Sequence, residues 1–140
     1  MPGWAQRPNP CPIRTYHWGK PFDADKANDE RTVGETSAVG CYSAGCSPYG
    51  CEEMSGNVWE WTRNLWGKDL LKPDFVYQYK TDNLKREDLD AGDETWRVVR
   101  GGLWGNDRLN ARCASRLRSR PYSRGRYQDF CVVLRSGPVA

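Results

Sequence analysis

The sequence predicts an α+β domain in which short strands are separated by long, irregular loops. Two segments are typical of strands: residues 58–62, in which Val58, Glu60 and Thr62 alternate with two Trp, and residues 95–100, which are followed by Gly101 and Gly102. Seven Trp, fourteen Gly and nine Pro among 140 residues favour turn-rich structure held by aromatic anchors over long helices. This length suits a single domain with a core of its own.

The remaining segments follow from composition, in chain order. Residues 1–16 hold four Pro and no hydrophobic periodicity, which indicates a lead-in arm or the remnant of a longer segment. Residues 17–40 begin with an aromatic turn at His17 and continue as a loop rich in oxygen-bearing side chains. Residues 67–94 are highly charged, and we expect a surface insertion with a short strand near residues 76–79. Residues 103–129 lack periodicity, residues 130–134 read as a final apolar strand, and residues 136–140 form a tail.

Composition also bears on the class of function. No apolar run approaches the length of a membrane span, and residues 1–7 show no secretory signal, so a cytoplasmic location is the default expectation. Residues 100–135 carry nine Arg but no Lys. A surface that simply tracks phosphates has no reason to exclude Lys, so nucleic-acid binding is disfavoured.

Histidine and cysteine usage restricts metal and nucleophile chemistry. The single His, His17, lies in an aromatic context that favours a packed turn over a catalytic base. Cys41, Cys46 and Cys51 recur every five residues, without the paired C-x2-C spacing of zinc sites. Buried thiols or one or two disulfides are favoured over a metal cluster of these three with Cys11. The redox compartment stays open.

A turn before the first strand has oxygen ligands at a useful spacing. The carbonyl groups of Gly56 and Val58, two residues apart, can point the same way as the carboxylate of Glu60. Backbone carbonyl and carboxylate oxygens are the ligands that Ca²⁺ prefers.

Four ordered motifs resemble the formylglycine-generating enzyme (sulfatase-modifying factor) family. Residues 54–62, Met-Ser-Gly-Asn-Val-Trp-Glu-Trp-Thr, are similar to its G-N-V-W-E-W signature, and residues 97–104 to its R-V-x-R-G-G-S-W segment. Residues 112–116 and 130–133 fall where the family has an R-x-A-x-R element and a closing G-F-R-V, and Trp18-Gly19 and Lys26-Ala27-Asn28 also match. The resemblance implies a variant of the C-type lectin fold over residues 17–135. The family's N-terminal half, with its R-L-P-T-E-A-E-W-E element, has no counterpart in these residues.

The resemblance also implies structural calcium. Matching positions give one site at Glu53, Gly56, Val58 and Glu60. A further site would use Asn28 and Asp29, although the family's later acidic ligand falls in a loop that is shorter here.

Departures from the family argue against catalysis. The enzymes use a reactive cysteine pair in the interval that corresponds to residues 103–111, and this interval contains no cysteine. Related iron-dependent sulfoxide synthases need several His residues. We therefore expect no enzyme activity, with an oxidase working through Cys113 and Cys131 as the alternative.

One subgroup of the family, the variable proteins of diversity-generating retroelements, diversifies its last region. Errors at template adenines turn Asn codons into codons that cannot encode Trp, Met, Lys, Gln or Glu. Residues 103–131 contain two residues of these types, against 23 in the other 111 positions. The resemblance predicts a non-catalytic protein that binds a ligand, a protein rather than a nucleic acid, through a diversified surface of paratope-like composition. The candidate ligand-binding residues are Trp104, Gly105, Asn106, Asp107, Arg108, Leu109, Leu117, Ser119, Arg120, Tyr122, Ser123, Gly125, Arg126 and Tyr127.

Overall fold

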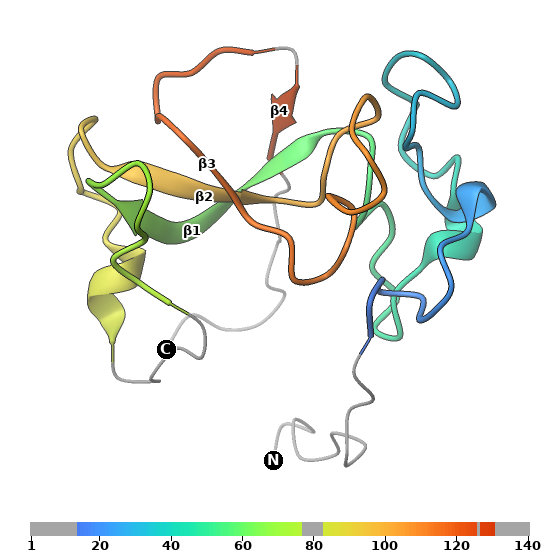
Figure 1. The fold of residues 1–140 in the computed structure, drawn as a ribbon, viewed down its shortest axis with the longest axis horizontal. Helices are drawn as coiled ribbons and strands as arrows, with labels where there is room; N and C mark the ends of the chain where they lie inside the picture. Colours follow the sequence, from blue (N-terminus) through green and yellow to red (C-terminus); the bar gives the residue numbers. More distant parts are fainter. Residues whose placement is uncertain (1–13, 77–82, 126, 131–140) are drawn as a thin grey trace, which may run out of the picture.

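A computed structural model describes residues 14–76, 83–125 and 127–130 of the chain. Two 3₁₀ helices, η1 (Ala24–Lys26) and η2 (Ser43–Gly45), precede the first strand, and a third, η3 (Leu84–Glu87), follows it. The strands are β1 (Trp59–Gly67), β2 (Trp96–Arg100), β3 (Leu117–Ser119) and β4 (Gln128–Asp129). Figure 1 shows the strands on one side of the molecule and the loops of residues 14–57 on the other. The predicted α+β, C-type-lectin-like architecture of short strands and irregular loops is confirmed.

The four strands form one sheet in the order β3-β2-β1-β4. The central pair is antiparallel, with Glu60 opposite Arg100 and Leu65 opposite Arg97. β3 pairs antiparallel with β2, whereas β4 pairs parallel with the start of β1. The sheet therefore joins the 58–62 motif, the 95–100 motif and both ends of the 120–127 loop.

The core of the sheet lies on its central strands. Val98 and Val99 of β2 are almost completely buried, as are Trp59 and Leu65 of β1. The bulky aromatic and branched residues of these segments suit a pleated, half-buried surface, which explains why both strands could be predicted. β2 is followed by Gly101 and Gly102, both with φ of 95°, a backbone conformation that residues with a Cβ rarely adopt.

The sheet is strongly curled. In a flat sheet, β3 and β4 would be separated by three inter-strand spacings, about 14 Å. Instead, the side-chain amide of Gln128 in β4 donates a hydrogen bond of 2.6 Å to Ser119 Oγ in β3. This bond joins the two ends of the 120–127 loop, which arches away from the sheet at the top of Figure 1.

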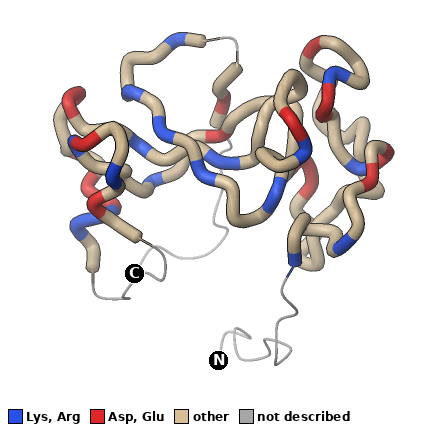
Figure 2. Tube along the Cα trace, viewed as in Figure 1, with Lys and Arg blue, Asp and Glu red and all other residues tan. Residues whose placement is uncertain are grey.

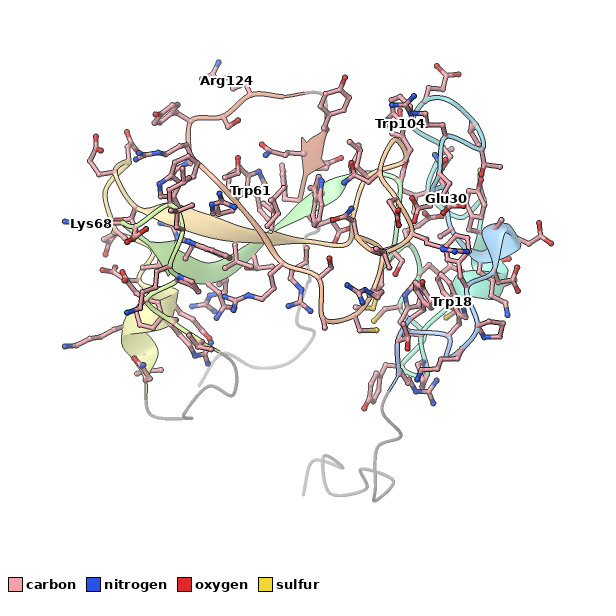
Figure 3. The ribbon with its side chains drawn as sticks, in the orientation of Figure 1. Trp18, Glu30, Trp61, Lys68, Trp104 and Arg124 are labelled. Carbon is pink, nitrogen blue, oxygen red and sulfur yellow. The ribbon has the colours of Figure 1, made fainter. Side chains whose placement is uncertain are left out.

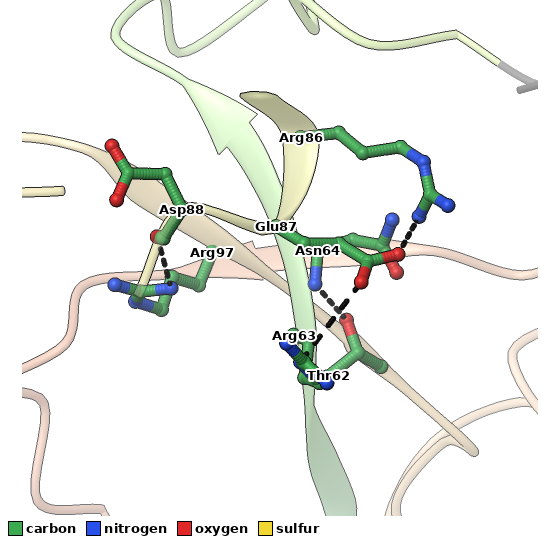
Figure 4. Close-up of polar contacts among 7 residues, drawn as sticks. All are labelled: Thr62, Arg63, Asn64, Arg86, Glu87, Asp88 and Arg97. Atoms are coloured by element: carbon green, nitrogen blue, oxygen red, sulfur yellow. Dashed lines mark hydrogen bonds and ion pairs between the residues drawn. The ribbon is translucent and has the colours of Figure 1, made fainter. Parts of the chain in front are cut away.

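The charged insertion is tied to the sheet through side chains of its central strands (Figure 4). Arg97 of β2 donates hydrogen bonds of 3.3 Å and 3.1 Å to the carbonyl groups of Asp88 and Leu89. Arg63 of β1 lies 4.0 Å from the Glu87 carboxylate of η3. These contacts fix the second half of the insertion against β1 and β2.

Some elements differ from the sequence-based expectations. β1 continues to Gly67, five residues past the predicted end of the strand at residue 62, and β3 was not predicted at all. Val76 lies outside any strand, and the rest of the predicted 76–79 strand falls outside the described residues, as do residues 131–134 of the predicted final strand. Within the described ranges, no helix is long and apolar enough to cross a membrane.

The turn before β1 allows a sharp test of this packing. Gly56 has φ of 77°, and a Cβ at this position would overlap the carbonyl group of Asn28, with the carbonyl carbon only 2.9 Å away. We predict that Gly56→Ala lowers the free energy of unfolding by about 3 kcal/mol, measured by urea denaturation. Gly92→Ala is the control, because a Cβ added at Gly92 would meet nothing within 4 Å, and it should change stability by less than about 1 kcal/mol. Equal effects of the two substitutions would contradict the packing at Gly56.

Candidate functional site

Asn57 joins two loops to the start of β1. Its backbone N–H donates to the Asn28 carbonyl at 2.8 Å, and its carbonyl accepts from the N–H of Trp104 at 3.0 Å. Its side chain forms a matched pair with Ser37: Oδ1 accepts from the Ser37 N–H at 2.9 Å, and Nδ2 donates to the Ser37 carbonyl at 3.1 Å. Asn57 is buried and has φ of 63°, a region in which Asn is enriched among non-glycine residues. The loops of residues 28–37 and 101–106 are therefore fixed relative to the start of β1.

The four residues of the calcium set predicted before β1 lie together. Glu53, Gly56, Val58 and Glu60 all line one cavity of about 310 Å³. Asp129 of β4 lines the same cavity and is the register partner of Glu60. Sequence reasoning missed Asp129, because only the parallel pairing of β4 with β1 brings it to this place.

The chemistry of this cavity fits a cation. Glu53 Oε1 accepts a hydrogen bond of 3.2 Å from the Gly40 N–H, whereas the buried Oε2 finds no partner among the described residues. Burial raises the pKa of the Glu60 carboxyl, and the negative charges of Asp129 and Glu53 raise it further. A bound cation would relieve both effects. No group of three or more His, Cys, Asp or Glu in the described ranges is arranged to hold a metal, so the site would need backbone carbonyl oxygens as well.

The second predicted pair, Asn28 and Asp29, is among the most buried in the protein. Their side chains are 0 % and 2 % exposed, yet Asn28 Oδ1 and Asp29 Oδ2 find no hydrogen-bond partner in the described residues. Burial raises the pKa of the Asp29 carboxyl to about 6, with smaller contributions from the neighbouring charges of Glu30 and Asp107. Two buried oxygens without partners on consecutive residues are a costly arrangement, which a cation bound to both would relieve.

The first candidate ligand-binding cluster, residues 104–109, lies beside the Asn28–Asp29 loop. Trp104 and Asn106 accept backbone hydrogen bonds from Arg31 and Glu30 at 2.8 Å and 3.2 Å. Figure 3 shows Trp104 and Glu30 on the same side of the molecule. Trp104, Gly105 and Asn106 are half-buried, whereas Asp107, Arg108 and Leu109 are exposed. Arg108 lies 3.8 Å from the Glu30 carboxylate, in an exposed ion pair that contributes little to stability.

The second cluster, residues 117–127, is mostly the arch between β3 and β4. Tyr122, Ser123, Gly125 and Tyr127 are exposed, as is Leu117 in β3. The Tyr127 ring meets the Trp104 ring edge-on at a centroid distance of 6.4 Å, which joins the two clusters at one end. Ser119 differs from the set because it is buried and bonded to Gln128, so it supports the arch from within. Arg126 lies outside the described residues.

Several arginines of this region stack on tryptophans of the sheet. The guanidinium groups of Arg116 and Arg118 lie 5.5 Å and 5.3 Å from the ring centroid of Trp66, and that of Arg120 lies 4.2 Å from Trp96. Arg120 also donates to the Glu94 carbonyl at 2.8 Å. Figure 2 shows the Arg positions that follow one another along this part of the trace. Planar guanidinium groups suit such stacking better than ammonium groups, so Arg at these three positions has a structural reason that sequence reasoning missed.

His17 packs in a turn, and it lines a cavity of about 160 Å³ that Cys113 and Glu60 also line. His17 is buried, its Nδ1 lies 2.9 Å from Ser55 Oγ, and its Nε2 contacts the Gly45 carbonyl, which supports the prediction of a packed turn. Cys41, Cys46, Cys51 and Cys113 are free thiols. All but Cys46 are exposed, which differs from the expected buried thiols or disulfides, and Cys11 and Cys131 lie outside the described residues.

Comparison with known proteins gives a consistent picture. The family described as "Sulfatase-modifying factor enzyme 1-like domain" matches residues 12–136. Hercynine oxygenase of Mycolicibacterium smegmatis is 38 % identical over 93 residues, which are 65 % of this chain and 21 % of that protein. Serine/threonine-protein kinase pkn1 of Chlamydia caviae is 32 % identical over 106 residues, 76 % of this chain and 15 % of the kinase. The chain thus spans about a fifth or less of these relatives.

A solved structure supports the same fold. Variable protein 1 of Treponema denticola superposes with a TM-score of 0.55 at 22 % identity, over 82 % of this chain and 39 % of that protein. At this identity, the likeness concerns the fold alone.

The arginine stacking can be tested by a conservative substitution. We predict that Arg120→Lys lowers the free energy of unfolding by about 1 kcal/mol, because the ammonium group loses the stacking on Trp96 and the forked donors. Arg124→Lys, at an exposed position of the arch, should change it by less than about 0.5 kcal/mol. Urea denaturation of both variants gives the comparison, and indistinguishable midpoints would show that the stacking contributes nothing.

Proposed function

This chain belongs to the family of sulfatase-modifying factor enzyme 1-like domains, and we propose that it is a non-catalytic member that binds a protein ligand. One observation carries the proposal. Leu109, Tyr122 and Tyr127 are 52 %, 64 % and 42 % exposed on the loops that follow β2 and β3. Large apolar side chains on loops held by a fixed scaffold are typical of binding surfaces.

The anchoring of these loops supports the proposal. The backbone of Trp104 is held on both sides, by Asn57 and by Arg31, while the edge of its ring contacts Tyr127. The arch is closed at its base by the Ser119–Gln128 hydrogen bond. Fixed backbones with exposed aromatic side chains bury area on binding at a low cost in entropy, which is how Tyr and Trp act in paratopes.

The arginine contacts favour a protein partner over a nucleic acid. Arg116, Arg118 and Arg120 lie against tryptophans, and Arg120 also bonds to the insertion. Side chains held in this way are poorly placed to follow a phosphate backbone. The exposed loops combine Tyr, Ser, Gly and Leu with single charges of both signs, which suits a protein surface.

Several features argue against a catalytic role. Residues 103–111 contain no cysteine, and Cys131 lies outside the described residues. Cys113 is exposed as a residue, but partial desolvation of its thiol raises the pKa of that thiol, and the positive charge of Arg100 offsets this only in part. A thiol with a raised pKa is a poor nucleophile and a poor metal ligand at neutral pH. Hercynine oxygenase is named for an enzyme activity, yet His17 is the one His of these 140 residues and both its ring nitrogens contact neighbouring groups.

We infer that calcium has a structural role in this chain. The unpartnered oxygens of Glu53, Asn28 and Asp29 support two sites, one below β1 and one beside the 104–109 loop. Ca²⁺ would supply the positive charge that neutralises the buried carboxylates, and the chain's own carbonyl groups would complete its coordination.

The finer proposal is that the ligand-binding surface is diversified by a retroelement. We predict that sequencing of the surrounding locus will find a near-copy of the DNA for residues 103–131 beside a reverse transcriptase gene. Adenines should stand in that copy at the codons of exposed residues such as Tyr122, Ser123 and Tyr127, and the codon of buried Ser119 should be identical in both copies. A locus without such a copy would refute diversification and leave ligand binding untouched.

Enzyme activity can be tested directly. We predict that the full chain, incubated with a sulfatase-type cysteine peptide, forms no formylglycine aldehyde detectable by mass spectrometry. The matched variant is Cys113→Ser, which replaces the exposed thiol of the R-C-A element. Aldehyde that appears with the unmodified chain and disappears with this variant would overturn the non-catalytic proposal and establish the oxidase alternative.

A further inference from the structure

We propose that calcium bound by Asn28 and Asp29 fixes the loop of residues 104–109, so that this part of the binding surface is formed only in the presence of calcium. The inference rests on the ligand-binding function proposed above and adds its regulation. Its basis is a chain of contacts from two buried oxygens to the backbone of the loop.

The starting point is the carboxylate of Asp29, whose two oxygens have different surroundings. Oδ1 accepts a hydrogen bond of 2.6 Å from the N–H of Glu30. Oδ2 is buried without a partner among the described residues, next in sequence to the equally unpartnered Oδ1 of Asn28. A cation bound to these two free oxygens would fix the orientation of the Asp29 carboxylate. It would thereby also fix the position of the Glu30 N–H, which donates to the other oxygen of that carboxylate.

That amide continues the chain of contacts into the binding surface. The Glu30 N–H also donates to the Asn106 carbonyl at 3.2 Å, and the next N–H, of Arg31, donates to the Trp104 carbonyl at 2.8 Å. Glu30 and Arg31 have φ of 50° and 59°. Two consecutive non-glycine residues in the left-handed region store backbone strain and persist only where their surroundings hold them there. Without a cation, this turn is free to relax and to release the 104–109 loop.

Charge couples the two segments in the same direction. Glu30 follows Asp29 in the chain, and Asp107 belongs to the binding loop itself, next to the Asn106 that Glu30 bonds to. In the metal-free state these negative charges repel one another, and the exposed Arg108–Glu30 pair at 3.8 Å, which is weak because water screens it, offsets only part of this preference for separating the loop from residues 28–31. A divalent cation reverses this preference, and the loop should in turn raise the affinity for calcium.

Hydrogen exchange of the full chain, followed by mass spectrometry with and without calcium, tests the coupling. The inference predicts that 1 mM CaCl₂, relative to EDTA, slows exchange about tenfold or more in peptides covering residues 28–32 and also in those covering 102–109. Mg²⁺ at about the same concentration should have little effect, because it requires a stricter octahedral geometry. Peptides covering β2, whose residues make none of these contacts, should exchange equally in both conditions.

Two variants separate the Asp29 pair from other effects of calcium. Asp29→Asn keeps the shape of the side chain and removes its charge, and it should abolish the calcium response of both segments. Asp25→Asn removes an exposed carboxylate nearby in the sequence and should retain the response. Asp107→Asn should weaken calcium binding about threefold or more, in a titration followed by the same exchange, and leave the response at saturation. Circular dichroism of each variant checks that it folds. If Asp29→Asn does not fold, the comparison of the unmodified chain with and without calcium still tests the coupling.

The exchange results at residues 28–32 and 102–109 test the calcium site and the coupling separately. Slower exchange at residues 28–32 alone would overturn the coupling and leave a calcium site. No change at either segment would overturn the inference entirely. Because no ligand enters the experiment, its failure leaves the ligand-binding proposal intact. Aldehyde formation by the chain would remove the non-catalytic proposal without affecting the exchange result.

Discussion

The hydrogen bonds of Asn57 are the constraint on which the rest of the structure depends. Its backbone and side chain together join the 28–37 loop, the start of β1 and the 101–106 loop. The position needs a side chain that tolerates a positive φ and offers a donor and an acceptor to one backbone, and Asn meets both needs. Gly56 beside it allows the Asn28 carbonyl to approach where any Cβ would obstruct it. Regular structure is sparse in this fold, so hydrogen bonds from side chains hold the loops in place where other folds use packed helices.

The same constraint explains why the candidate cation sites and the binding loops are neighbours. The loops that Asn57 joins contain the Asn28–Asp29 pair on one side and Trp104 on the other, and the cavity below β1 begins at the adjoining Gly56. Buried oxygens are concentrated where loops, rather than helices or strands, cross the interior, because loop groups have no ladder of backbone bonds to satisfy them. The proposed cation sites and the proposed binding loops therefore share the same segments for a physical reason.

Much of this arrangement could be predicted from the sequence, and the parts that could not have identifiable causes. β1 begins with alternating Trp, β2 is rich in Val and Trp, and Gly101-Gly102 marks the end of β2. The cavity residues Glu53, Gly56, Val58 and Glu60 came from the motif and do lie together. β3 was missed because the sequence around it, Arg-Leu-Arg-Ser-Arg, has no apolar face, and its side chains are stabilised by Trp66 and Trp96, distant in the sequence. Asp129 was missed for the same kind of reason, since a parallel pairing of two residues leaves no local pattern.

The arginine contacts sharpen the compositional argument for diversification. Stacking on Trp66 and Trp96 accounts for Arg in place of Lys at positions 116, 118 and 120, so these residues no longer support a codon-based explanation. What remains are the exposed positions of the 104–127 region, where stacking imposes no choice. Solvated surfaces ordinarily use Lys and Glu freely, as the insertion does at Lys68, Lys85 and Glu94. The exposed positions between 107 and 127 contain neither, although Arg and Asp are both present. A requirement for charge alone would accept Lys as well as Arg, and Glu as well as Asp, at such positions. The restricted codon set allows Arg and Asp and excludes Lys and Glu.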